Sequence, residues 1–474
     1  MRVLPFLAAL ALSAPLLACG SSSPSGFTQG GDGSVGDDGG VDPDADPFGT
    51  QDGDIDARPQ CENLQCQQVT CQSGKTTVSG KVYDPGSKRG LYNVFVYVPN
   101  APTAPFAAGV TCTACQAPAS GIPVVSTTTK PDGTFVLDDV PVGQDIPIVL
   151  QLGKWRRKLT LPNVTACQDN PQPDKSLRLP KNHNEGDIPL LALTTGCDQA
   201  ECFLVNTVGL DPAEITGPTG AGRVHIYRGN DDNQGLPANT GTATALFASL
   251  PTMKKYDIVF DACECSTYDR GTPQGYANMK SYLDNGGRMF GTHYFYNFFA
   301  SQAQCQYDST CQGPADFSGV AEWMQSQYLP APYYINTTLP KGKALADWYK
   351  GVKPSSTYGQ LPLVDVREDV HRVTAGKATP WLYAGDLKNS YDAYYLSFNT
   401  PVTQPVANQC GKAVFSDVHL VDTMANMTQA WPAACGGGYS YQDHSDNELA
   451  LEFLFFDLSS CVQDETKPPP PPPN

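Results

Sequence analysis

The chain has 474 residues and carries 31 Lys and Arg against 48 Asp and Glu, for a formal net charge of -17. This length predicts two or three domains, and a composition of 40% hydrophobic and 17% charged residues excludes a wholly disordered or coiled-coil protein. The acidic balance argues against nucleic-acid binding, which requires clustered positive charge. The 44 glycines and 41 prolines favour a β component rich in turns.

The N-terminus has the pattern of a secretory signal. One Arg precedes an apolar run over residues 3–17, which is too short for a comfortable membrane span. The following Leu16-Leu17-Ala18-Cys19 resembles a bacterial lipobox. That resemblance implies that residues 1–19 are a lipoprotein signal peptide and that Cys19 carries the lipid. We therefore expect a cell-envelope protein whose membrane partner is its own lipid, and Gly20 favours the outer membrane.

The ends of the chain look unlike the rest. Residues 20–60 hold nine Asp and one Arg among many Gly and Ser, so this segment supplies -8 of the net charge and has little to bury. We expect a disordered acidic tether there. Residues 462–474 end in a run of prolines, which predicts a stiff polyproline tail.

The 16 cysteines of an exported chain predict disulfides, since the compartment is oxidising. Without Cys19, fifteen are left, so at least one thiol is unpaired within the chain or pairs between molecules. Cys112-x-x-Cys115 alone is compatible with zinc or a redox couple, but no second such pair accompanies it, which favours disulfide bonding. Cys263 and Cys265 are interpreted in the same way. Spacing leaves the connectivity open.

Residues 61–193 predict an antiparallel β-sandwich, because short strands such as residues 78–82, 92–98, 134–137 and 147–152 alternate with turn sequences. The stretches VSGKVYD from Val78 and KPDGTFVLDDVPVG from Lys130 resemble the carboxypeptidase regulatory-like domain. The resemblance implies a small transthyretin-like sandwich that serves as an accessory binding module. Trp155 and Arg156 are candidate binding residues for a sugar or peptide. The alternative is a buried Trp beside an edge strand protected by charge.

Residues 197–461 predict an α/β domain of the three-layer, flavodoxin-like kind. Strands are expected over residues 223–227, 256–262, 288–291, 394–399 and 412–415, and helices over residues 242–249, 276–283, 317–328, 342–349 and 447–458. This alternation predicts a mostly parallel sheet covered on both faces. Ligands of such sheets bind outside the carboxyl ends of the strands, so the residues that follow each strand are the ones of interest.

Polar residues follow three of these strands: Glu264, His293, and Asp417 with His419. The sequence GGRMFGTH from Gly286, together with His371-Arg372-Val373-Thr374 and GKAVF from Gly411, resembles the ThuA-like branch of the class I glutamine amidotransferase-like fold. The whole arrangement resembles a group of exported, cysteine-rich myxobacterial lipoproteins. His293 stands where an amidotransferase has its nucleophilic cysteine, and Val421 replaces the carboxylate expected two residues after His419. Glutamine hydrolysis is therefore not expected.

The sequence favours a lipid-anchored binding protein over an enzyme, with a glycan or another envelope component as the partner and no nucleic acid. The alternative is a hydrolase or isomerase that acts on a carbohydrate-like substrate through His and carboxylate groups, with or without a metal ion. A third hypothesis is a purely structural protein. We expect Glu264, His293 and His419 to line one cleft as the catalytic candidates, with His371 and Asp417 as neighbours. The aromatic run at residues 294–299 is either a sugar-stacking surface or part of the core.

Overall fold

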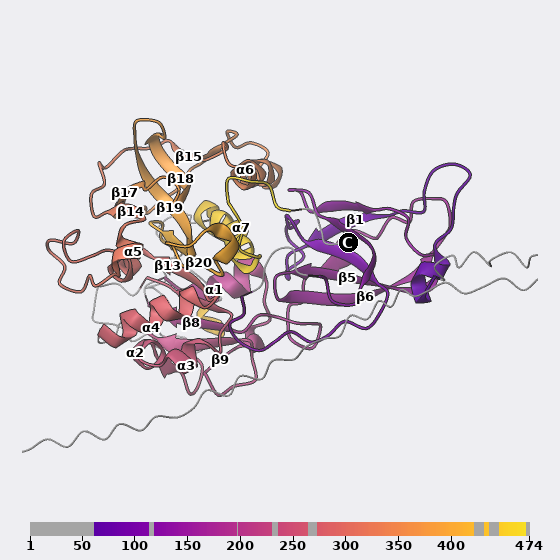
Figure 1. Cartoon of the computed structure of the whole chain (residues 1–474), viewed down its shortest axis with the longest axis horizontal. Helices are drawn as coiled ribbons and strands as arrows, with labels where there is room; N and C mark the ends of the chain where they lie inside the picture. Colours follow the sequence, from indigo (N-terminus) through magenta and orange to yellow (C-terminus); the bar gives the residue numbers. More distant parts are fainter. Residues whose placement is uncertain are drawn as a thin grey trace, which may run out of the picture. The chain divides into compact units, whose positions relative to one another are not determined.

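The computed structural model describes residues 61–112, 118–196, 198–229, 236–263, 273–420, 431–435 and 445–470. Cys19, the expected tether, Cys265 and Glu264 lie outside these residues. Within them, the chain forms several sheets, mixed and antiparallel, with a modest helix content (Figure 1). No helix of the described part has both the length and the apolar character needed to cross a bilayer.

The N-terminal part of the described chain consists of two small sheets. A three-stranded sheet has the order β4-β1-β7, and a four-stranded antiparallel sheet has the order β3-β2-β5-β6. Alternate residues of β1, β2 and β5 point into a shared core, as the sequence pattern predicted. The strands are β1 (Val78–Tyr83), β2 (Phe95–Pro99), β3 (Pro123–Thr128), β4 (Thr134–Leu137), β5 (Gly143–Leu152), β6 (Trp155–Val164) and β7 (Leu177–Arg178).

An 11-stranded sheet organises the rest of the described chain, with the order β11-β10-β8-β12-β13-β20-β19-β18-β15-β16 and β9 beside β10. The strands from β11 to β20 in this order are parallel, whereas β19, β18, β15 and β16 continue the sheet antiparallel. The parallel strands are β8 (Leu191–Thr195), β9 (Ile215–Thr216), β10 (Val224–Arg228), β11 (Gly241–Thr242), β12 (Ile258–Asp261), β13 (Arg288–Thr292) and β20 (Gly411–Ser416). The antiparallel ones are β15 (Tyr333–Ile335), β16 (Gln360–Leu361), β18 (Thr379–Asp386) and β19 (Ser390–Thr400).

Helices lie on both faces of the parallel strands, and the strand residues divide accordingly. Val259 and Met289 pack with the residues of α2, α3 and α4, while Ile258, Phe260 and Phe290 pack with α7. α7 is buried on nearly all sides, and apolar residues occupy every side of it apart from the paired carboxyl groups Glu452 and Asp457. The helices are α1 (Ala200–Cys202), α2 (Ala243–Phe247), α3 (Leu250–Met253), α4 (Pro273–Asp284), α5 (Ala315–Ser318), α6 (Pro340–Val352) and α7 (Ser445–Ser459), with shorter helical turns η1 (Asn63–Gln67), η2 (Phe203–Val208), η3 (Pro212–Glu214), η4 (His293–Phe298), η5 (Val406–Asn408) and η6 (Ala433–Cys435).

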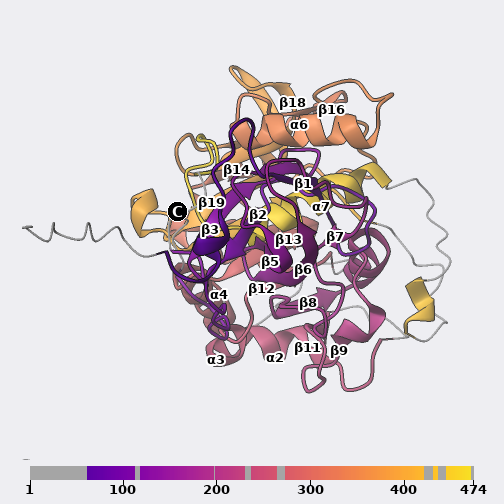
Figure 2. The ribbon, with the colours of Figure 1, turned by 90° about the vertical axis from the view of Figure 1, so that its right-hand side faces the viewer.

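Residues 61–474 make one unit, and one hydrophobic core runs from the small sheets into the large one. Trp155 of β6 packs edge-on against Phe455 and Phe456 of α7, with ring centroids 6.3 and 5.7 Å apart. Figure 2 shows the strands of the small sheets in front of the large sheet. The expected boundary after Leu193 falls inside β8, which pairs with β10 and β12 of the large sheet.

One helix expected in the C-terminal half was wrong, and two other features there differ from expectation. The helix expected over residues 317–328 ends at Ser318, because Gly319 follows and β14 (Ala321–Trp323) pairs antiparallel with β17 (Val370–Val373) instead. Phe317, Val320 and Trp323, the apolar residues that suggested a helix, are buried although the segment continues as a loop and the strand β14. The sheet is mixed, because β19 returns antiparallel to β20. The tail expected from residue 462 begins later, since Glu465 is buried against Lys341 and Lys412.

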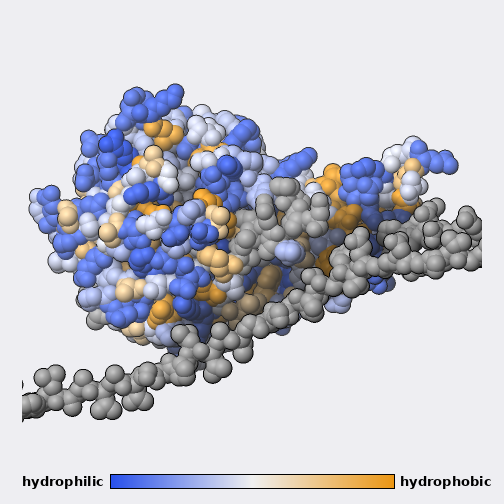
Figure 3. Space-filling view, in the orientation of Figure 1, coloured by the Kyte–Doolittle hydropathy of each residue, from blue (hydrophilic) through white to orange (hydrophobic). Residues whose placement is uncertain are grey.

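Disulfide bonding is confirmed for the described cysteines other than Cys263. The pairs within the described residues include Cys61–Cys66, Cys71–Cys167, Cys112–Cys410, Cys202–Cys435 and Cys305–Cys311. Cys112 therefore bonds to the loop before β20, a connection that spacing along the chain did not indicate. In the space-filling view, apolar residues on the displayed face lie in small groups among polar ones (Figure 3).

Candidate functional site

Four neighbouring parallel strands each end in a polar residue at the same edge of the large sheet. Asp198 follows β8, Cys263 follows β12, His293 follows β13 and His419 follows β20. Their carboxyl ends meet at one edge because the strands are parallel and adjacent in the order β8-β12-β13-β20. The strand-end rule thus brings together His293 and His419, as predicted. Glu264, the third predicted member, lies outside the described residues.

Cys263, His293 and His419 form a buried cluster whose nitrogen and sulfur ligand atoms all lie within 4.8 Å of one another. The sulfur of Cys263 is 3.5 Å from His293 Nδ1, and the centroids of the two imidazole rings are 5.0 Å apart. Cys263 is a thiol in the structure, so its interpretation as a disulfide partner was wrong. Three donor groups of the kinds that bind transition metals therefore converge at one point.

The backbone at His293 is held in an unusual conformation. Its φ is 42°, in the left-handed region that residues with a side chain rarely adopt, and this residue begins the helical turn η4 directly after β13. The turn requires glycine at 291, because a Cβ atom there would lie 2.0 Å from the ring of Phe295. The strained turn places the imidazole at the end of the strand, the position that the sequence resemblance assigned to the missing nucleophile.

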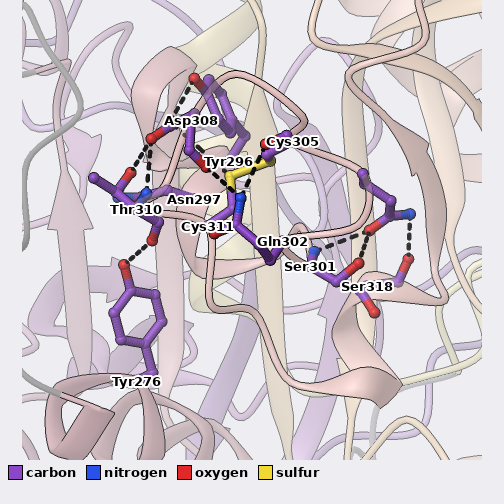
Figure 4. The surroundings of a disulfide bond; sticks show 11 residues. Tyr276, Tyr296, Asn297, Ser301, Gln302, Cys305, Asp308, Thr310, Cys311 and Ser318 are labelled. Atoms are coloured by element: carbon purple, nitrogen blue, oxygen red, sulfur yellow. Dashed lines mark hydrogen bonds between the residues drawn. A yellow bond between two sulfur atoms is a disulfide. The ribbon is translucent and has the colours of Figure 1, made fainter.

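The disulfide-bonded loop Cys305–Cys311 follows η4 and is hydrogen-bonded to it (Figure 4). Asp308 accepts hydrogen bonds from the hydroxyl of Tyr296 at 2.9 Å and from the backbone N–H of Thr310 at 2.8 Å. The aromatic run after His293 is part of the core, since Phe295, Phe298 and Phe299 are fully buried. Because these side chains fill the core, they form no sugar-stacking surface.

Asp198 orients His419. The carboxylate of Asp198 lies 2.8 Å from His419 Nδ1 and also 3.3 Å from the hydroxyl of Thr292, which donates to it. With Nδ1 directed at Asp198, Nε2 faces the cluster; this atom is buried and has no hydrogen-bond partner among the described residues. Burial lowers the pKa of His419, but the Asp198 carboxylate, with Cys263, outweighs it and raises that pKa to about 11.

A pair of buried carboxyl groups borders the cluster. Asp369 Oδ2 lies 3.9 Å from His293 Nε2, and the backbone N–H of Asp369 donates to Asp417 Oδ2 at 2.8 Å. Burial raises the pKa of Asp369 to about 7, and burial with the neighbouring Asp369 charge raises the pKa of Asp417 well above its ordinary value. Asp417, a predicted neighbour of the site, is therefore close to the cluster through Asp369.

His371 takes part in a different network. Its Nδ1 is 2.8 Å from Asp392 Oδ1, and Asp392 also accepts hydrogen bonds from the backbone N–H groups of Gln327 and Leu329. This network holds the loop after β14 against β19. We assign His371 a structural role.

The two predicted binding residues on β6 differ. Trp155 is fully buried against α7, as in the alternative interpretation of a buried Trp, and is not available to bind a ligand. Arg156 is also buried, but it borders a cavity between the small sheets and the C-terminal end of α7.

Three residues of the site were set aside or missed in the sequence. Cys263 was interpreted as a disulfide partner. Asp198 was missed because β8 was not predicted, although the buried run Leu191–Thr195 preceding it is a strand signal. Asp369 precedes the short strand β17, where no pattern marked it.

No family model matches the chain, and no curated protein is similar to it in sequence. Among solved structures, a ThuA-like protein from Bacteroides uniformis is a weak neighbour, with 10% identity, a TM-score of 0.28, and coverage of 56% of this chain and 88% of that chain. A type II cohesin-X-dockerin complex from Acetivibrio cellulolyticus matches 26% of this chain and 76% of that chain, with 14% identity and a TM-score of 0.16. Likenesses this weak support no argument about function.

Proposed function

We propose that this chain is an exported hydrolase that binds a divalent transition metal ion through Cys263, His293 and His419. Zinc is the metal that best matches one thiolate and two imidazole ligands. The observation that supports this proposal is the convergence of one sulfur and two imidazole groups within 4.8 Å in a buried position. A zinc ion bound by three protein ligands supplies a Lewis acid that activates water at neutral pH. The carbohydrate-like substrate class expected from the sequence remains part of the proposal.

The donor atoms fit zinc in type and spacing. A sulfur at about 2.3 Å and a nitrogen at about 2.0 Å from zinc, at a tetrahedral angle, lie about 3.5 Å apart. The distance from Cys263 Sγ to His293 Nδ1 is 3.5 Å. His419 presents a buried Nε2 while Nδ1 is bound to Asp198, which is the carboxylate–histidine arrangement that orients metal-binding imidazoles.

Asp369 is a buried carboxyl group next to the proposed metal ligand His293. Its Oδ2 is buried, lies 3.9 Å from His293 Nε2 and has no hydrogen-bond partner among the described residues. Because Nδ1 of the same ring faces Cys263, Asp369 lies on the side of His293 away from the proposed metal, where it would orient this imidazole as Asp198 orients His419. Asp417 holds Asp369 in position by accepting a hydrogen bond from its backbone N–H.

A second candidate function is thiol-based acyl transfer. Asp198, His419 and Cys263 form a carboxylate–imidazole–thiol series, in which Asp198 orients His419 and His419 interacts with Cys263. Such a series is the arrangement that activates a cysteine nucleophile. It gives His293 no part in the reaction, which is why we rank it second.

Metal analysis of the purified chain separates these functions. We expect about one zinc ion per chain by mass spectrometry, and less than a tenth of that in Cys263→Ser and His293→Ala. His183→Ala is the matched control, because His183 is a half-exposed histidine paired with Glu214. It should keep its metal.

Hydrolysis of a panel of sugar esters and glycosides then tests for catalysis. Activity that is lost with a chelator and restored by zinc supports the metal-dependent hydrolase. A metal-free wild-type chain that hydrolyses esters, and loses this activity in Cys263→Ser alone, would instead establish the thiol function. Binding of a sugar without turnover would return the chain to the binding role that the sequence favoured.

We also propose that the chain is anchored in the cell envelope, in the outer membrane, through lipid on Cys19. The sandwich is proposed to be transthyretin-like, of the carboxypeptidase regulatory-like kind, and the α/β part flavodoxin-like. The lipobox-like sequence before Cys19 supports the anchor. A Cys19→Ala variant that stays as firmly membrane-bound as the wild type would refute it.

A further inference from the structure

A cavity of about 430 Å³ lies between the small sheets and the large one, well suited in size to a small organic ligand. Its walls come from β2, β5 and β6, from residues 104–111, and from the C-terminal end of α7. Many of the lining side chains are apolar, among them Phe95, Ala104, Pro105 and Phe106. It is lined by none of the residues of the Cys263 cluster.

Arg156 brings a guanidinium group to this largely apolar cavity, where its Nε is paired with Asp187. The residue is 2% exposed, its Nε donates to Asp187 at 2.9 Å, and its guanidinium group lies 4.1 Å from the centre of the Phe106 ring. Its Nη1 is buried without a hydrogen-bond partner among the described residues. A guanidinium N–H left without an acceptor costs free energy, so an acceptor on a ligand would be bound strongly there.

Gln151 adds an acceptor beside this donor. Gln151 of β5 is the cross-strand partner of Arg156, so both side chains lie on the same face of the sheet. The Oε1 atom of Gln151 is also buried and lacks a hydrogen-bond partner in the described part of the chain. By contrast, the Nζ of Lys154, which also lines the cavity, is already bound to two carbonyl groups and to Asp257.

We propose that this cavity binds a small amphipathic carboxylate, whose anionic group is bound by Arg156 and whose apolar body packs against Phe95 and Pro105. The aromatic and aliphatic walls exclude a fully hydrophilic ligand, because such a ligand would lose its hydration without new hydrogen bonds. Guanidinium is the side-chain group that best matches a carboxylate, which it binds through charge-assisted hydrogen bonds. This site is independent of the proposed hydrolase site.

Calorimetric titration of the full chain with 4-phenylbutanoate tests the proposal. For a ligand of this size we expect a Kd of about 0.1–1 mM, and binding of 4-phenylbutan-1-ol about 10- to 100-fold weaker, because the alcohol lacks the charge that Arg156 binds. Arg156→Met should reduce binding of the acid by the same factor. Arg157→Met is the matched control, since Arg157 faces the opposite side of the strand and pairs with Glu185.

A second variant keeps the test decisive if Arg156→Met fails to fold. Ala104 is an exposed residue at the cavity, so Ala104→Trp should block the cavity and abolish binding while the melting temperature stays unchanged. Cys263→Ser should bind 4-phenylbutanoate as the wild type does, which separates this proposal from the metal site. Equal binding of the acid and the alcohol, equal loss in Arg156→Met and Arg157→Met, or no binding at about 10 mM would overturn the proposal.

Discussion

Glu452 of α7 is a buried carboxyl group at the contact between the small sheets and the large one, and its replacement by Gln should flatten the dependence of stability on pH. The side chain is fully buried and accepts a hydrogen bond from Arg89 Nε, and this Nε also lies 3.7 Å from the carboxylate of Asp84. The guanidinium group of Arg89 is therefore the cationic partner of both buried carboxyl groups, Asp84 and Glu452. Burial, reinforced by the Asp84 charge, raises the pKa of Glu452 to about 8 in spite of Arg89.

The direction in which the free energy of unfolding changes with pH depends on which state of the chain binds the proton of Glu452 more tightly. The folded chain keeps Glu452 protonated up to about pH 8, whereas the unfolded chain loses this proton near pH 4.5. The stabilising contribution is therefore complete below pH 4.5 and is lost as the pH rises toward 8. The slope is about 1.4 kcal/mol per pH unit well below the folded-state pKa and half of that at the pKa, so the loss between pH 6 and pH 8 is about 2 kcal/mol. Glu201 and Asp369, whose pKa values burial raises to about 7, add to the same trend.

Chemical denaturation at pH 6, 7 and 8 measures this effect. We expect the free energy of unfolding of the wild type to fall over this range, and that of Glu452→Gln to fall by about 2 kcal/mol less, because Gln does not titrate. Glu322→Gln is the control, since Glu322 is a half-exposed partner of Arg372. A Glu452→Gln variant with the same pH slope as the wild type would refute the reasoning.

Three further substitutions test other contacts. Lys341→Met should destabilise the fold by about 3–5 kcal/mol in thermal or denaturant unfolding, because Asp457, which it pairs with at 2.7 Å, is then left buried with one cation fewer. Replacing Cys112 and Cys410 together by Ser should lower the free energy of unfolding by about 2–5 kcal/mol, as for other native disulfides. Asp198→Asn should weaken zinc binding about 10- to 100-fold in a competition assay with a chelating dye, because the His419 imidazole loses the carboxylate that orients it.

Four parallel strands of the large sheet, β10, β12, β13 and β20, were predictable because strands buried on both faces read as short apolar runs. β12, β13 and β20 were each found in this way, and the rule that ligands bind at the carboxyl ends of such strands placed His293 and His419 together. The antiparallel extension was harder to predict. β18 carries exposed and half-buried residues, and the pattern of its sequence alone does not reveal which neighbour it pairs with.

The composition of the site was only half predictable, for two physical reasons. Disulfide connectivity depends on distances in the folded chain, so spacing did not identify Cys263 as a cysteine that remains a thiol. Asp198 depends on β8, a strand whose partners β10 and β12 come later in the chain, so its place at the site edge is a property of the sheet order. Arg156 was named from the sequence as a candidate binding residue next to Trp155. The cavity that it lines is formed by segments far apart in the chain, so it could not be predicted from the sequence.

A thiol in a chain of disulfides needs a reason to stay reduced, and the neighbours of Cys263 supply one. The residue is buried, its sulfur lies 3.5 Å from an imidazole nitrogen, and no described cysteine is bonded to it. A metal ion held by this sulfur would occupy the electron pair that attacks an alkylating agent, so metal binding should protect Cys263 beyond the protection that burial gives. We therefore expect iodoacetamide to modify Cys263 at least about tenfold faster after the metal is removed by a chelator, and re-addition of zinc to restore the slow rate. Peptide mass spectrometry of the native chain measures both rates, and circular dichroism of the chelated chain checks that the fold is intact. Equal rates with and without the chelator, in a folded chain, would mean that burial alone protects the thiol and that the cluster binds no metal.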